Sequence, residues 1–298
     1  MRGRRAVRRF DLWGVPFDGG ATLGWPGSRY GPERVRRALG WITMRVQDGR
    51  VFDVDAGRLR AIEPDLLVDR GDVAVVPHDL LATLDATSEA VGETVGAGRV
   101  PIVVGGDDSL LFAVVRGVHD AAPGTVAVVH FDAHFDLMDE SPRQGRFSHS
   151  SGMRRALELP RVRADASIQV GVRHYNFPAS RAFAEEAGLE QLPAREVQRM
   201  GVEAAAARVW ERVERADRVV WCFDIDVVDP AFAPGAGAHE PGGLTAREAL
   251  DAVELLAPAC DAFLVAEVNP TTDVGDMTST LAAYLVYRFA VAGAEPGA

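Results

Sequence analysis

Cysteine, lysine and long apolar runs are scarce in this chain of 298 residues. The only cysteines are Cys222 and Cys260, which provide no disulfide framework, so we expect a protein of the reducing cytoplasm. Every basic residue other than histidine is an arginine, which indicates a biased genome more than a function. No apolar run approaches the ~18 residues that span a membrane, so we expect no membrane partner.

An excess of basic residues is missing too, because the formal net charge is −11. Nucleic acid is therefore not an expected partner. Arginines do gather at the N-terminus, but this segment lacks the apolar stretch of a secretory signal. We expect residues 1–9 to form a flexible, solvated arm. No low-complexity linker divides the chain, so residues 1–298 are predicted to form a single domain.

Short β-branched runs alternate with longer helical patterns along the chain. Expected strands are residues 10–15, 73–76, 100–104, 125–131, 167–172, 218–223 and 263–268. Expected helices are residues 31–39, 78–97, 108–118, 151–158, 179–187, 202–216, 245–256 and 278–291. Thr245 and Glu248 have the spacing of a capping box. The alternation predicts an α/β fold with three layers, α/β/α, around a mostly parallel sheet.

Acidic residues gather around the ends of four expected strands, where such sheets bind their ligands. In chain order they are Asp107 and Asp108; Asp132 and Asp136, with His134 between them; Asp224, Asp226 and Asp229; and Glu267. A lone aspartate after a strand is usually a turn former or helix cap, and we interpret Asp107, Asp139 and Asp229 in this way.

The spacing of the remaining residues predicts a metal site. In an extended chain, residues i, i+2 and i+4 point to the same side, so Asp132, His134 and Asp136 can converge, as can Asp224 and Asp226. Carboxylates this close disfavour one another's ionisation unless cations neutralise them. Carboxylate oxygen with imidazole nitrogen suits Mn²⁺ and related ions, and the lack of cysteine ligands disfavours structural zinc.

Three segments, "DAHFD" (132–136), "DIDVVDP" (224–230) and "GGD-S" (105–109), resemble the metal signatures of the ureohydrolase superfamily, the arginases and agmatinases. The resemblance continues in order through residues 14–36, the segment around His149, residues 234–245 and "EVNP" (267–270). It implies a single α/β domain, usually assembled as a trimer or hexamer. It also implies two Mn²⁺ ions per subunit and hydrolysis of a guanidino group to urea and an amine.

Residue roles follow from the same resemblance. The metal ligands that it implies are Asp108, Asp132, His134, Asp136, Asp224 and Asp226. Asp136 is also expected to contact a metal-bridging hydroxide that attacks the guanidinium carbon. His149 corresponds to the histidine that assists proton transfer near the mouth of the site, and Glu267 to the acid that binds the substrate guanidinium.

Asp108 departs from the family's pattern, in which a histidine ligand follows the glycine-glycine-aspartate motif. An aspartate can bind Mn²⁺ through oxygen, although its shorter side chain must still reach the ion. Two outcomes stay open. One is a binuclear site with additional negative charge, and the other is weakened occupancy in a non-catalytic family member.

The substrate is also left open among several classes. The segments "FSHSSGMRRALE" (147–158) and "PGSRYGP" (26–32) resemble the agmatinase branch, which favours agmatine or a related guanidinoalkyl compound. Arg143 and Arg146 keep guanidinobutyrate open, because either could bind a carboxylate. Formimidoylglutamate ranks third, and the paired clusters disfavour a single-zinc deacetylase. We interpret His239 as a loop histidine and Cys222 as a small buried thiol.

Overall fold

The computed structural model describes residues 8–21 and 23–294, so most of the expected flexible arm lies outside the described residues. At the end of that arm, Arg9 pairs with Asp65, with 2.8 Å between Nε and Oδ1. Arg8 donates a hydrogen bond to the carbonyl oxygen of Ala257 (3.2 Å). These two arginines are therefore anchored on the fold rather than solvated.

A single eight-stranded sheet forms the centre of the fold, and all its strand pairs are parallel. The strands are β1 (Phe10–Gly14), β4 (Leu67–Asp72), β5 (Val100–Val104), β6 (Val126–Phe131), β7 (Ile168–Val170), β8 (Glu190–Leu192), β9 (Arg218–Asp224) and β10 (Ala262–Ala266). Their spatial order is β4-β1-β5-β10-β9-β6-β7-β8. The central strands are largely apolar because helices cover both faces of the sheet, and their polar residues are His130 in β6 and Arg218 and Asp224 at the two ends of β9.

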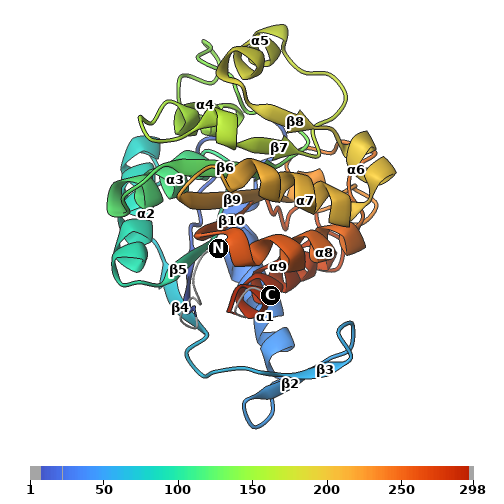
Figure 1. Ribbon diagram of the computed structural model, residues 1–298. Helices are drawn as coiled ribbons and strands as arrows, with labels where there is room; N and C mark the ends of the chain where they lie inside the picture. The colour runs from blue at the N-terminus through green and yellow to red at the C-terminus, as the bar shows by residue number, and fades with distance from the viewer. Residues whose placement is uncertain (1–7, 22, 295–298) are drawn as a thin grey trace.

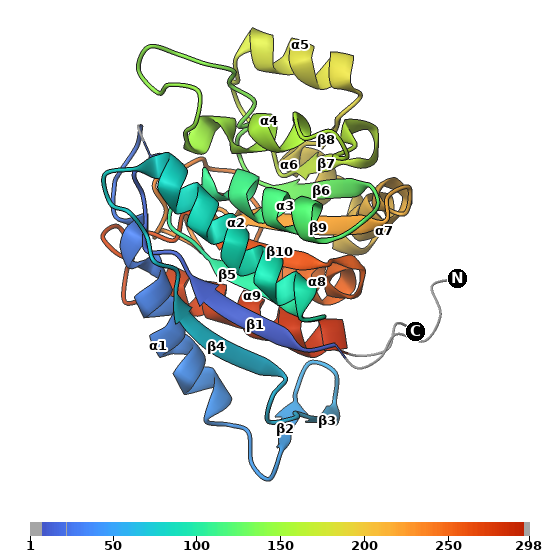
Figure 2. The same ribbon diagram turned by 90° about the vertical axis from the view of Figure 1, so that its left-hand side faces the viewer.

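Helices form the two outer layers (Figures 1 and 2). They are α1 (Gly31–Thr43), α2 (Leu80–Gly96), α3 (Leu110–Ala121), α4 (Gly152–Leu157), α5 (Pro178–Ala187), α6 (Ala194–Met200), α7 (Val202–Val213), α8 (Ala246–Leu256) and α9 (Met277–Ala294). Helices α2, α3 and α4 pack together on one side, and α1, α7, α8 and α9 on the other. The predicted three-layer α/β/α fold is confirmed. The predicted capping box is present too, with Thr245 and Glu248 each accepting from the other's backbone N–H.

Some predicted elements are wrong or missing. Residues 73–76 are not a strand; β4 lies directly before them, and its polar sequence concealed it because it is an exposed edge strand. The short elements β8 and α6 were not predicted. The hairpin of β2 (Arg50–Asp53) and β3 (Arg58–Ala61) was also missed, and it projects from the body (Figure 1).

Aromatic side chains fill the core on the α9 side of the sheet. Trp221 is fully buried and contacts Phe131, Phe263 and Phe289, with ring centroids 5.0, 5.1 and 6.4 Å away. Phe263 and Phe289 stack at 4.4 Å. These contacts make the sheet a rigid support for the residues that follow its strands. No helix in the described part of the chain has the length and apolar character needed to traverse a bilayer.

Candidate metal centre

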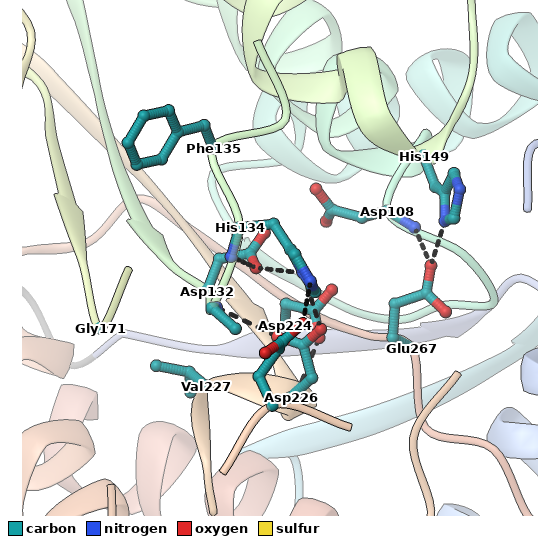
Figure 3. A network of polar contacts seen from close by, with 12 residues as sticks. Asp108, Asp132, His134, Phe135, His149, Gly171, Asp224, Asp226, Val227 and Glu267 are labelled. Carbon is teal, nitrogen blue, oxygen red and sulfur yellow. Dashed lines mark hydrogen bonds and ion pairs between the residues drawn. The ribbon is translucent and has the colours of Figure 1, made fainter. Parts of the chain in front are cut away.

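The predicted site residues meet at the carboxyl edge of the four central strands (Figure 3). Because β5, β10, β9 and β6 are adjacent in the sheet, their ends present neighbouring segments. Asp108 follows β5, and Glu267 follows β10 directly. Asp132, His134 and Asp136 follow β6, while Asp224 ends β9 and Asp226 lies in the short helical turn Ile225–Val227 after it. The strand order thus brings together residues that are far apart in the sequence.

Strand alternation is not what makes these side chains converge. The extended chain stops at Phe131, and the residues after it form a loop in which Asp136 has φ of 48°. Glu267, directly after β10, also has positive φ, at 60°. The left-handed region is unfavourable for a residue with a side chain, and such strain is typical of functional sites. The two positive φ angles therefore support a functional interpretation of both residues.

Two groups of potential ligand atoms share Asp132. One consists of Asp108, His130, Asp132 and Asp136, and the other of Asp132, His134 and Asp226; within each group the atoms lie within 4.8 Å of one another. His134 Nδ1 lies 3.0 Å from Asp226 Oδ2 and 3.3 Å from Asp132 Oδ1. A carboxylate shared by two groups can bridge two cations, as a binuclear site requires.

Asp224 is outside both groups but lies beside them. It lines the same cavity as Asp136 and Asp226, and one of its oxygens accepts from the backbone N–H of Asp226 (2.8 Å). Asp226 lies in the 3₁₀ turn and not in the strand, so this turn, rather than strand alternation, brings Asp224 and Asp226 to the same cavity.

The buried carboxylates of the site are clustered closely enough that bound cations would stabilise them. Burial, reinforced by repulsion from neighbouring carboxylates, raises the pKa of both Asp136 and Asp224 well above the usual value. Burial alone would lower the pKa of His134, but the carboxylates of Asp226 and Asp132 outweigh it and raise that pKa. Asp108 Oδ2 and Asp132 Oδ2 are buried and lie 3.3 and 2.9 Å from His130 Nε2, with no well-aligned hydrogen bond to either oxygen. Buried carboxylate oxygens without a well-aligned hydrogen bond fit divalent cations.

His149 and Glu267 form a pair beside these groups. His149 Nδ1 lies 3.5 Å from Glu267 Oε1, and this oxygen also accepts from the backbone N–H of Asp108 (3.0 Å; Figure 3). Burial raises the pKa of Glu267 to about 7, against the opposing effect of His149. The Glu267 carboxylate in turn outweighs burial and raises the pKa of His149.

The three aspartates interpreted as turn or cap residues have structural contacts. Asp107 accepts from the backbone N–H groups of Gly20 and Ala21 (2.8 and 3.1 Å), which ties the loop after β1 to the site. Asp229 accepts from three backbone N–H groups of the 230–243 loop. Asp139 is not a turn former but pairs with Arg155 (2.7 Å) and Arg146 (3.4 Å).

His130 and Gln169 are polar residues near the site that sequence reasoning missed. His130 is fully buried in β6, and its Nε2 lies 2.9 Å from Asp132 Oδ2 and 3.3 Å from Asp108 Oδ2. Cys222 is the small buried thiol that was predicted, but its Sγ also donates to Asp108 Oδ1 (2.9 Å). The signal for His130 was a histidine inside an otherwise apolar strand, two residues before Asp132.

A cavity opens from the site to the surface. Its lining includes His134, Asp136, Asp224, Asp226, Glu267 and His149. Toward solvent it is bordered by apolar side chains, among them Leu23, Trp25 and Phe177, which are 52%, 65% and 60% exposed. The cavity therefore joins an acidic interior to an apolar, aromatic mouth.

Comparison with known proteins agrees with this geometry. A sequence model described as the arginase family matches residues 8–292. The chain belongs to the arginase family. It is 35% identical over 283 residues to proclavaminate amidinohydrolase of Streptomyces clavuligerus, covering 93% of this chain and 87% of the relative. It is 33% identical to guanidinopropionase of Pseudomonas aeruginosa, covering 98% and 89%.

The solved structure of proclavaminate amidinohydrolase from Streptomyces clavuligerus has the same fold, with a TM-score of 0.82 and 30% identity over 98% of this chain and 93% of that one. The predicted superfamily is therefore confirmed. So is the predicted enzyme class, a hydrolase of amidino C–N bonds. In the arginase family such hydrolases act on guanidino compounds.

Proposed function

We propose that this member of the arginase family is a manganese-dependent amidinohydrolase of an agmatine-like linear guanidino compound. The observation that supports it most directly is the pair of acidic groups sharing Asp132 at the end of an open cavity. Oxygen-rich donors with imidazole suit Mn²⁺. Two ions per chain would be held by Asp108, Asp132, His134, Asp136, Asp224 and Asp226. When bound, they would supply Lewis acidity and a water of lowered pKa.

The chain's own residues bind the substrate and move the proton. Glu267 faces the cavity and binds the guanidinium by charge-assisted hydrogen bonds. His149 lies beside it, and its Nε2 is buried without a partner. This nitrogen is therefore free to deliver a proton to the leaving amine. Asp136, held in its left-handed conformation, orients the attacking water.

The mouth of the cavity supports an agmatine-like tail. Among the described residues that line it there is no arginine, and Arg143 and Arg146 are not part of the lining. Arg146 instead pairs with Glu158 (2.7 Å). A substrate carboxylate would thus find no guanidinium partner there, whereas the exposed faces of Trp25 and Phe177 suit an alkyl chain or an ammonium group. The names of the relatives cover several guanidino substrates and do not decide this point.

A substrate panel tests the proposal. Purified protein is incubated with Mn²⁺ and agmatine, 4-guanidinobutyrate, formimidoylglutamate or pentylguanidine, which carries no charged tail group. Urea from the guanidino compounds, and formamide from formimidoylglutamate, is then measured. We expect the highest kcat/KM for agmatine. A higher kcat/KM for 4-guanidinobutyrate would contradict our inference that the end of the substrate opposite the guanidino group is not a carboxylate. No product from any compound, together with less than two Mn²⁺ per chain, would favour a non-catalytic family member.

We also propose a homo-trimer or homo-hexamer. Trp41, Met44, Phe52 and Leu59 are exposed apolar side chains at the end of α1 and on the projecting β2–β3 hairpin. Apolar residues gathered on a protruding segment are typical of surfaces that another chain covers. Light scattering of the purified protein tests this, and a monomer would contradict it.

A further inference from the structure

A row of polar side chains crosses the sheet and leads to Asp108. Gln191 of β8, Gln169 of β7, His130 of β6 and Cys222 of β9 are register neighbours on four adjacent strands. Gln169, His130 and Cys222 are completely buried. Buried polar groups are costly unless they are hydrogen-bonded, so such a row needs a reason. We call these four residues the polar row.

The direction of donation along the polar row is determined from its outer end. The guanidinium of Arg181 can only donate, and its Nη1 donates to Gln191 Oε1 (2.8 Å). Gln191 Nε2 then donates to Gln169 Oε1 (2.8 Å). Gln169 Nε2 donates to the carbonyl oxygen of Phe135 (2.7 Å), so this amide cannot be flipped. Its second hydrogen points to His130 Nδ1, 3.1 Å away.

This direction determines the tautomer of His130. Because Nδ1 accepts from Gln169, the ring proton is on Nε2. Nε2 faces the carboxylates of Asp132 and Asp108. A metal-bound histidine has the opposite arrangement, in which the second ring nitrogen donates. His130 therefore lies among potential ligands but has no lone pair to offer at Nε2.

We propose that the polar row positions the Asp108 carboxylate, with Cys222 donating a hydrogen bond to it and the Nε2–H of His130 directed at Asp132 and Asp108 together, so that neither His130 nor Cys222 acts as a metal ligand. The inference rests on the proposed function, in which Asp108 helps to hold a metal. Cys222 donates to Oδ1, and His130 faces Oδ2. Asp108 is shorter than the histidine that the family resemblance leads us to expect at this place. Holding its carboxylate from two sides aligns it before an ion arrives.

Titration calorimetry of the metal-free protein with MnCl₂ tests the positioning role without any substrate. Replacing a partner that orients a ligand costs roughly 10- to 100-fold in metal affinity, so we expect losses in this range for Cys222→Ala and Gln169→Met. Cys222→Ser keeps a donor and should bind like the wild type. Gln198→Met is the matched control, because Gln198 donates to the carbonyl oxygen of Gly243 in a loop. Equal losses in Cys222→Ser and Cys222→Ala, or no loss in either Cys222→Ala or Gln169→Met, would overturn the proposal.

Spectroscopy provides a second measurement on the wild-type protein, so it does not depend on whether a substituted protein folds. Long-range ¹H–¹⁵N NMR spectra of histidine rings show which nitrogen carries the proton, before and after Cd²⁺ is added. We expect His130 to keep its proton on Nε2 in both states. Loss of that proton on Cd²⁺ binding, or a thiolate charge-transfer band in the Co²⁺-loaded protein, would overturn the proposal. Urea release by the wild type decides the proposed function separately.

Discussion

Replacing Glu267 by glutamine tests the substrate-binding role at a residue that the fold should tolerate. Glutamine keeps an oxygen that can accept from the backbone N–H of Asp108, now 3.0 Å from Glu267 Oε1. It loses the charge that would bind a guanidinium. A hydrogen bond to a charged group contributes about 1.5–3 kcal/mol, so kcat/KM for the best guanidino substrate should fall roughly 10- to 150-fold.

The pH dependence of kcat/KM tests the same role of Glu267 independently. Because burial raises the pKa of Glu267 to about 7, the wild type should lose kcat/KM as pH falls through about 7 and this carboxylate takes up a proton. The E267Q variant should lack this limb. Glu158→Gln is the matched control, because Glu158 pairs with Arg146 and Arg154 outside the cavity. An E267Q enzyme with unchanged kcat/KM and an unchanged acidic limb would refute the reasoning.

The raised pKa of Glu267 also predicts how the E267Q substitution changes the free energy of unfolding of the metal-free protein. A carboxyl whose pKa is higher in the folded state destabilises the fold progressively as pH rises from its unfolded value of 4.5 to about 7. Above pH 7, metal-free E267Q should therefore be more stable than metal-free wild type, by up to about 3 kcal/mol. Urea denaturation measures this, and a destabilised E267Q would show that Glu267 is ionised at no such cost.

Three further predictions concern the support of the site. Phe289→Ala should lower the free energy of unfolding by about 3–5 kcal/mol in urea denaturation, since Phe289 is buried and stacks on Phe263; a loss below about 1 kcal/mol would contradict the packing. Gly106→Ala places a Cβ only 1.6 Å from the carbonyl oxygen of Phe17. The backbone must therefore shift, so both the Tm and the rate of urea release should fall. An unchanged Tm and an unchanged rate would refute this close approach. Removing metal with a chelator should lower Tm, since an ion at a hundred times its Kd stabilises by about 2.7 kcal/mol; a Tm indifferent to Mn²⁺ would argue against the site.

Much of the architecture was readable from local pattern. Strands β5, β6, β9 and β10 are largely apolar runs because both their faces are buried, and such runs are recognisable in a single sequence. The polar edge strand β4 and the short β8 carry no such pattern, because their residues are not selected for burial on both faces. The site motifs were readable for a related reason, since the acidic residues proposed for the site lie at or shortly after the ends of buried strands.

Residue types and their order along the chain were thus enough to indicate the fold class, the family resemblance and the acidic residues around the strand ends. They could not show that Asp136 and Glu267 adopt left-handed backbone conformations, or that loops rather than strand alternation bring the carboxylates together. Nor could they place Gln191, Gln169, His130 and Cys222 in one row leading to Asp108. Strand register and order depend on packing between segments far apart in the chain, and only the folded structure contains that information.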